Sequence, residues 1–409
     1  MDPHAGDRGG SGLTDGRGSL REVLLASLRL GLTSFGGPIA HLGYIRAEYV
    51  VRRRWLDDAR FADLLALSQA LPGPASSQLG IPIGTIRAGR LGGIAAWLGF
   101  TLPSAIALVA FALVTGSLDL AGAGWVHGLK LAAVAVVAQA VVSMWRSLAP
   151  DVARSLVVLA AAGVALAWPS PLAQVAIIVA GGVIGRLLLR PPAGAASAAG
   201  TGQADRRFAV ACLALFAALL VGLPVLREAV ASQAIALAES FYRAGSLVFG
   251  GGHVVLPLLH ESVVPPGWVG EDRFLAGYGA AQAVPGPLFT FAGFLGASAG
   301  PAPNGTLGAT IALVAIFLPS FLLVWGVLPF WDALRARPDV RRALTGVNAA
   351  VVGILLAALV TPVWTSAVDG PLDALLAGIA AVVLIRFRAP PWAVVIGMAG
   401  VAEVVPRVS

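Results

Sequence analysis

The stretch RLGLTSFGGP at residues 29–38 returns in the same chain as RAGSLVFGGG at residues 243–252. Further along, SQALPGP at residues 68–74 returns as AQAVPGP at residues 281–287. The spacing between copies is 214 residues at Phe-Gly-Gly (249 minus 35) and 213 at Pro-Gly-Pro (285 minus 72). A spacing this constant indicates an internal duplication, and we expect the function to lie where the two copies meet.

The duplication extends well beyond these two motifs. Matched residues follow at nearly the same spacing: Glu48 and Glu261, Trp55 and Trp268, Arg60 and Arg273, Phe61 and Phe274, the Leu-Pro-Ser motifs 102–104 and 318–320, and Gly128 and Gly346. We therefore treat the chain as two repeats.

The composition indicates an all-α integral membrane protein. The 409 residues are 57% hydrophobic and 12% charged, whereas soluble domains carry about 25% charged residues. Unbroken apolar runs of spanning or nearly spanning length lie near 92–116, 124–148, 151–168, 171–189, 208–222, 308–331, 344–361, 373–388 and 391–405. Because these runs do not alternate with polar residues, they exclude a transmembrane β-barrel. The single cysteine, Cys212, excludes a disulfide or a cysteine metal cluster within the chain.

The net charge of +7 is explained by arginines in cytoplasmic loops that meet anionic lipid, so we expect no nucleic acid partner. The arginines are distributed unequally between equivalent loops. Loop 51–60 has four arginines and its counterpart 264–273 has one, whereas loop 116–124 has none and its counterpart 332–342 has four. By the positive-inside rule, equivalent loops lie on opposite sides of the membrane, which predicts an inverted-topology repeat.

This topology predicts nine full spans plus four broken, re-entrant helical hairpins. The hairpins are residues 20–50, 61–86, 235–262 and 274–300, with the N-terminus cytoplasmic and the C-terminus outside. The predicted organisation is a disordered cytoplasmic tail (1–18), a first repeat (19–189), a linker (190–206), an unpaired span that reverses the orientation (207–222) and a second, inverted repeat (223–409).

The broken hairpins are where we expect the chemistry. Irregular backbone inside a membrane is tolerated only where it is buried or lines a polar cavity. A helix that restarts after a break offers unpaired N–H groups and the positive end of its dipole, which together favour an anion. The alternative is that the glycines and prolines only permit close helix packing. Four breaks in two symmetry-related pairs favour the anion site.

The candidate substrate-binding residues follow from the breaks. The Gly-Gly breaks contribute Phe35, Gly36, Gly37, His41, Phe249, Gly250, Gly251 and His253, and the Pro-Gly-Pro breaks contribute Gln69, Pro72, Gly73, Pro74, Ser76, Ser77, Gln282, Pro285, Gly286, Pro287 and Thr290. The histidines are too scattered along the chain for a metal motif, so we predict no metal and no cofactor.

Several ionisable residues inside apolar segments have two interpretations. Arg29 and Arg243, at equivalent positions, either clamp an anion or extend to the interface. Glu48 and Glu261 are either proton-coupling sites or ion-pair partners of Arg46, Arg29 or Arg243. Lys130, the only lysine, whose counterpart is Asn348, either senses substrate or protons or extends to the outer surface.

These motifs resemble the chromate ion transporter (CHR) family in its long, two-domain form. The resemblance rests on residues 31–43, 69–80, 247–253 and 282–290 and covers roughly residues 20–390. It implies a secondary transporter that exports chromate across the bacterial plasma membrane, driven by the membrane potential or by ion exchange, with sulfate as a competing analogue.

Other functions stay open. The chain could instead carry sulfate or another small anion, in a different direction. The weakest alternative is an intramembrane enzyme, because the spans contain no paired-carboxylate or metal motif, and no P-loop indicates ATP hydrolysis. The expected partners are a chromate- or sulfate-like oxyanion and the lipid bilayer, with a homodimer as an option.

Overall fold

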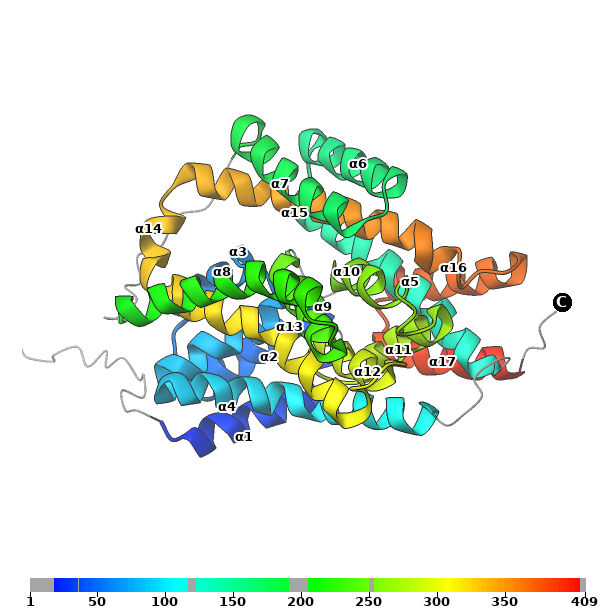
Figure 1. The fold of residues 1–409 in the computed structure, drawn as a ribbon, viewed down its shortest axis with the longest axis horizontal. Helices are drawn as coiled ribbons and strands as arrows, with labels where there is room; N and C mark the ends of the chain where they lie inside the picture. Colours follow the sequence, from blue (N-terminus) through cyan, green and yellow to red (C-terminus); the bar gives the residue numbers. More distant parts are fainter. Residues whose placement is uncertain (1–17, 36, 117–122, 191–204, 250–253, 405–409) are drawn as a thin grey trace, which may run out of the picture.

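The structure is a computed structural model that describes residues 18–35, 37–116, 123–190, 205–249 and 254–404. This part of the chain is helical and contains no β-strand (Figure 1). The expected tail and linker fall almost entirely outside the described residues, as do the candidate residues Gly36, Gly250, Gly251 and His253.

The first half begins with a broken pair of helices and continues into long ones. Its elements are α1 (Leu20–Thr33), α2 (Gly37–Arg46), η1 (Ala47–Arg52), α3 (Asp58–Ala70), α4 (Ala75–Gly116), α5 (Gly124–Leu148), α6 (Val152–Ala167) and α7 (Pro171–Leu188). The starts of α1, α3, α6 and α7 are set by N-cap side chains that accept a backbone N–H: Ser19, Asp57, Asp151 and Ser170.

The second half follows the same order after one additional helix, α8 (Arg206–Ala229). Its elements are α9 (Gln233–Leu247), α10 (Val255–Val263), α11 (Glu271–Ala283), η3 (Leu288–Thr290), α12 (Phe291–Ser298), α13 (Gly305–Val327), η4 (Leu328–Phe330), α14 (Trp331–Arg335), α15 (Pro338–Ala358), η5 (Leu359–Trp364), α16 (Pro371–Arg386) and α17 (Pro391–Val404). Helix α8 continues past residue 222, where we expected the unpaired span to end.

The segment from α1 to Trp55 turns back on itself. Ser27 Oγ lies 2.7 Å from Tyr49 Oη, Arg29 pairs with Glu48, and Trp55 Nε1 donates to Glu22. As the residue number falls along α1, its partner's number rises, which is the pattern of two antiparallel arms. The start and the end of this segment therefore lie at the same end of the molecule.

Helix α4 is itself a hairpin of two helical arms. Its backbone is non-helical at Ala88 and Gly89, where Gly89 has a φ of +72°. The arms pack so closely that a Cβ added to Gly84 would lie 2.3 Å from the carbonyl oxygen of Gly92. In the second half, Gly296 in α12 meets Gly308 in α13 in the same way, at 2.3 Å. Glycine is required at both crossings because any side chain would collide with backbone.

The helices of the two halves pack in matching pairs. Helix α1 packs on α4 as α9 packs on α13, and α5 packs on α16 and α17 as α15 packs on α6 and α7. Gly128 in α5 contacts the carbonyl of Met398 in α17, and its counterpart Gly346 in α15 contacts the carbonyl of Gly181 in α7. In Figure 1, α6, α7 and α15 form one flank, α1 and α4 form the opposite flank, and α8, α9 and α13 lie between them.

Five helices are long and apolar enough to cross a membrane: Ala75–Gly116, Gly124–Leu148, Arg206–Ala229, Gly305–Phe330 and Pro338–Trp364. Shorter apolar helices include α6, most of α7 and α17. The most apolar stretch of α8 is only 11% buried, so this helix lies at the edge of the bundle. The described chain is an all-α membrane protein, as the composition predicted.

Candidate functional site

The two Pro-Gly-Pro motifs form tips with the same backbone geometry. Gly73 has a φ of +127° and Gly286 a φ of +109°, values in the left-handed region that favour glycine. Each tip is bonded to the other half of the chain: Gly73 N–H donates to Val248 O at 2.6 Å and Gly286 N–H donates to Ser34 O at 3.0 Å. The two acceptors are equivalent residues, each just before a Phe-Gly-Gly motif. Each Pro-Gly-Pro tip is thus joined to the Gly-Gly break of the other repeat.

A serine from the opposite half closes each tip. A Cβ built on Gly73 would lie 2.7 Å from Ser320 Oγ, and a Cβ built on Gly286 would lie 2.8 Å from Ser104 Oγ. These serines belong to the repeated Leu-Pro-Ser motif, which the sequence identified as duplicated without indicating its partner. There is no room for a side chain at either tip glycine.

The two tips lie close together along α13. Phe317 contacts Phe289, just after the second tip, with ring centroids 5.9 Å apart. Ser320, three residues further along α13, contacts Gly73 of the first tip. Three residues of α-helix rise about 4.5 Å. The segments with the highest density of candidate residues therefore meet in the interior of the bundle.

The first tip leads into a polar helix start. Ser76 and Ser77 are buried in the first turn of α4, whose first N–H groups have no intrahelical acceptor. Gln78 Nε2 donates to Pro72 O at 2.5 Å and lies 3.4 Å from Ser320 Oγ. Sequence reasoning missed Gln78, although it immediately follows the two serines.

The second tip leads into an aromatic cluster. Thr290 ends the 3₁₀ turn η3, and its hydroxyl donates to Pro287 O at 2.7 Å. Phe289 and Phe291 are fully buried, and the Phe291 ring packs edge-on against Phe274. The side chains after the two tips therefore differ although the backbone does not.

Three buried hydroxyls at or beside the tips have no hydrogen-bond partner in the described part of the chain: those of Ser34, Ser77 and Thr101. They are 0%, 1% and 2% exposed. Ser34 supplies the carbonyl that accepts from Gly286, and Thr101 supplies the carbonyl that accepts from Ser104 Oγ. Buried hydroxyls are nearly always hydrogen-bonded, so these three have bonding capacity that a ligand or water would use. Sequence reasoning selected Ser77 but neither Ser34 nor Thr101.

The other candidates at the breaks have varied surroundings. His41 Nε2 lies 3.1 Å from Ser34 O, beside the second tip, and Phe35 packs near Trp392 with ring centroids 6.1 Å apart. Gln69 is exposed, whereas its counterpart Gln282 has a buried Nε2 with no hydrogen-bond partner among the described residues. Gly37 begins α2, and Phe249 follows the Val248 carbonyl that binds Gly73.

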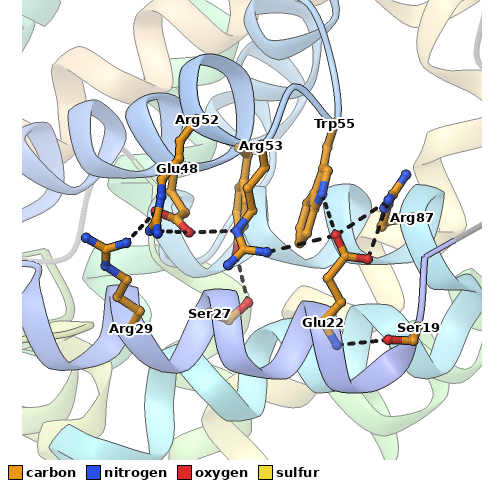
Figure 2. Close-up of polar contacts among 10 residues, drawn as sticks. Ser19, Glu22, Ser27, Arg29, Glu48, Arg52, Arg53, Trp55 and Arg87 are labelled. Atoms are coloured by element: carbon orange, nitrogen blue, oxygen red, sulfur yellow. Dashed lines mark hydrogen bonds and ion pairs between the residues drawn. The ribbon is translucent and has the colours of Figure 1, made fainter. Parts of the chain in front are cut away.

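Arg29 is part of a charged cluster at the base of the first hairpin (Figure 2). Buried Glu48 pairs with Arg29 at 3.8 Å, Arg52 at 3.1 Å and Arg53 at 2.7 Å. In the same cluster Glu22 pairs with Arg53 and Arg87 and accepts from Trp55 Nε1. Four arginines and two glutamates leave a formal charge of +2. The ion-pair interpretation of Glu48 is thus realised, with Arg29 as one partner, while Arg46 pairs with Asp58 instead.

The second half solves the same problem with a different glutamate. Arg243 pairs with Glu239 at 2.6 Å, and Arg227 binds the same carboxylate group at 2.6 Å. Glu261, the sequence match of Glu48, has only His260 nearby, at 3.8 Å. The difference arises because residues 265 and 266 are prolines where the first repeat has Arg52 and Arg53.

Lys130 lies away from the second tip. Its Nζ donates to Asp272 Oδ1 at 2.7 Å, and Asp272 stands at the start of α11 while the tip follows the end of that helix. The helix between them is roughly 17 Å long. Its counterpart Asn348 has a buried Oδ1 with no partner among the described residues.

One group of described residues has metal-ligand chemistry: His127, Asp369 and Asp373 offer ligand atoms that all lie within 4.8 Å of one another. His127 Nε2 already bonds to Asp373 Oδ1 at 2.8 Å, and Asp369 is exposed. We assign no metal here. The grouping joins residues far apart in the sequence, which is why their spacing did not suggest it.

Comparison with known proteins identifies the family. A family model described as "Chromate transporter" matches residues 21–186 and again residues 235–403. The chain is 32% identical to the chromate transport protein of Pseudomonas aeruginosa over 82% of this chain and 79% of that protein. It is 28% identical to the chromate transport protein of Cupriavidus metallidurans, over 90% of this chain and 89% of that protein. It is 29% identical to a probable chromate transport protein of Synechococcus elongatus, over 84% of each.

No solved structure gives a significant match to the chain. The double match of one family model agrees with the two repeats read from the sequence. The chain therefore belongs to the chromate transporter family, and as such it is a multi-pass membrane transport protein rather than an enzyme.

Proposed function

We propose that this protein exports chromate across the bacterial plasma membrane, with sulfate as a competing or exchanged anion. The observation that carries the proposal is the reciprocal pairing of each Pro-Gly-Pro tip with the Gly-Gly break of the other half. This pairing brings candidate residues from both repeats to one place inside the bundle. Family membership and the chromate transport proteins that resemble this chain support chromate as the cargo.

The oxyanion is held near the bilayer midplane by helix N-termini at the breaks. A tetrahedral dianion needs several hydrogen-bond donors, and helix starts supply N–H groups together with a partial positive charge. These donors carry no full charge, so they bind an anion without holding it too tightly for release. The glycines at the tips let the anion's oxygens approach the backbone.

The two repeats have opposite orientations in the membrane, with nine full spans and four re-entrant hairpins. The unequal arginine content of equivalent loops supports this arrangement. The antiparallel arms between Glu22 and Trp55 support the first hairpin, because they return the chain to its starting side. The N-terminus is then cytoplasmic and the C-terminus lies outside.

The arginine cluster around Glu48 and Glu22 serves as the cytoplasmic entrance for anions. Its formal charge of +2 attracts an oxyanion toward the base of the first hairpin. Arg29 is the cluster member that offers most to the anion, because its side chain is 55% exposed and its contact with Glu48 is the longest of the three. Glu261, which has no arginine partner of this kind, is a better coupling candidate than Glu48.

Anion uptake into inverted membrane vesicles tests the function. Vesicles that contain the protein should accumulate chromate when a membrane potential or a pH gradient is imposed, and sulfate should compete while phosphate serves as the comparison. Accumulation of sulfate without chromate would favour the alternative of a sulfate transporter. Uptake equal to that of vesicles lacking the protein would refute anion export.

A further inference from the structure

The buried polar groups at the tips are distributed unequally between the two repeats. The three unpartnered hydroxyls, of Ser34, Ser77 and Thr101, all belong to the first repeat. The second repeat has the same backbone at the equivalent positions, so a position-by-position comparison separates what the fold needs from what a ligand needs.

Two of the three counterparts are apolar. Ser34 corresponds to Val248 at the spacing of 214 seen at Phe-Gly-Gly, and Thr101 corresponds to Phe317 at the spacing of 216 seen at Leu-Pro-Ser (318 minus 102). Val248 is fully buried and Phe317 is 1% exposed. The fold therefore accepts apolar side chains at both positions, and the hydroxyls of the first repeat are not required for packing.

The third counterpart keeps its hydroxyl but uses the proton internally. Ser77 corresponds to Thr290, three residues after the second Pro-Gly-Pro proline. Thr290 Oγ1 donates to Pro287 O at 2.7 Å, whereas Ser77 Oγ has no partner among the described residues. The residue after Ser77 is Gln78, fully buried with an unpartnered Oε1, and the residue after Thr290 is Phe291.

We infer that the oxyanion is bound by side chains of the first repeat only, namely the hydroxyls of Ser34, Ser77 and Thr101. The second repeat contributes its backbone, the Gln282 amide and an aromatic wall that contains Phe289, Phe291 and Phe317. This inference rests on the proposed function and makes it more specific, because a symmetric two-tip site becomes a one-sided site. An unpartnered buried hydroxyl costs folding free energy, and a bound oxyanion offsets that cost by accepting the proton.

The test uses a matched pair of isosteric substitutions, Thr101→Val and Thr290→Val. Both threonines are buried, at 2% and 1% exposure, and each variant loses only a hydroxyl. Ser34→Ala and Ser77→Ala extend the first-repeat set. The measurements are equilibrium binding of radiolabelled chromate, with sulfate in competition, and the thermal stability of each purified full-length variant.

Thr101→Val, Ser34→Ala and Ser77→Ala should each weaken chromate binding by about tenfold or more, because each removes a hydrogen bond to a charged group. Their Tm should be unchanged or higher, because a buried unpaired polar group is lost. Thr290→Val should lower Tm, since Pro287 O loses its donor, and should keep chromate affinity within about twofold of wild type.

A wild type that binds chromate while the first-repeat variants keep full affinity would overturn the inference and leave the proposed function standing. An affinity loss in Thr290→Val as large as that in Thr101→Val would also overturn it. A wild type that binds neither chromate nor sulfate would refute the proposed function, and the inference with it.

Discussion

The two repeats share their backbone devices and differ in the side chains mounted on them. Arg46 pairs with Asp58 at 2.7 Å, and at the equivalent positions His260 pairs with Glu271 at 2.8 Å. Arg54 and Gly267, again equivalent, both have positive φ, at +52° and +76°. Backbone geometry was kept after duplication because the fold depends on it, whereas the chemistry at the same positions changed.

The strongest way to break this comparison is to ask whether the repeats face opposite ways. Arg54 and Gly267 are equivalent and exposed, so they suit cysteine labelling in a Cys212→Ser background. A membrane-impermeant thiol reagent applied from outside should label Gly267→Cys and not Arg54→Cys. The same reagent applied to inverted vesicles should give the reverse pattern. Labelling of both positions from one side would refute the inverted topology.

The charged clusters give the next largest effect. Glu48→Gln leaves three arginines around a buried site without their carboxylate, and hydrogen bonds to charged groups contribute about 1.5–3 kcal/mol. We expect the free energy of unfolding to fall by about 2 kcal/mol, measured by denaturant or thermal unfolding in detergent. Asp58→Asn is the control: its pair with Arg46 is exposed on both sides and should contribute less than about 1 kcal/mol. Equal effects would show that burial of Glu48 is energetically unimportant.

Arg29→Ala and Arg243→Ala sharpen the comparison at equivalent positions. Arg29 is 55% exposed, and Glu48 keeps two other arginines without it. Its loss should therefore weaken anion affinity about tenfold while stability changes little. Arg243 is 24% exposed and 2.6 Å from Glu239, so its loss should weaken affinity and also lower Tm. Chromate binding and thermal unfolding of both purified variants check this. Unchanged affinity in folded Arg29→Ala would assign that arginine to the ion-pair cluster alone.

Much of the fold could be predicted from hydrophobic runs and turn residues. The apolar run 124–148 is α5 with the same bounds, and the break after Ser34 lies where Phe-Gly-Gly predicted it. Local composition determines these features because a helix in lipid must satisfy its own backbone. The class of protein and its family followed from the same motifs, and both are confirmed.

The partners of those motifs could not be predicted, because they are set by packing between the repeats. Nothing near Gly73 in the sequence indicates Val248 or Ser320 as its neighbour. The sequence also left Arg29 between a clamp and an interface residue, whereas its contact with Glu48 is a tertiary feature. Likewise, Ser34 and Thr101 read as ordinary membrane-helix residues until their counterparts in the second repeat are compared with them.

The most direct test of an oxyanion site at the tips is chromate uptake by inverted vesicles that contain Gly73→Leu, Gly286→Leu or Gly267→Leu. All three glycines have positive φ, so the backbone strain of about 1–3 kcal/mol is common to the three variants. Only the tip glycines would place a Cβ within 3.0 Å of a neighbour, while Gly267 faces open space. We predict that both tip variants insert and purify as single species but transport no chromate, and that Gly267→Leu transports it. Wild-type uptake by both tip variants would contradict the account and reduce the tips to packing devices.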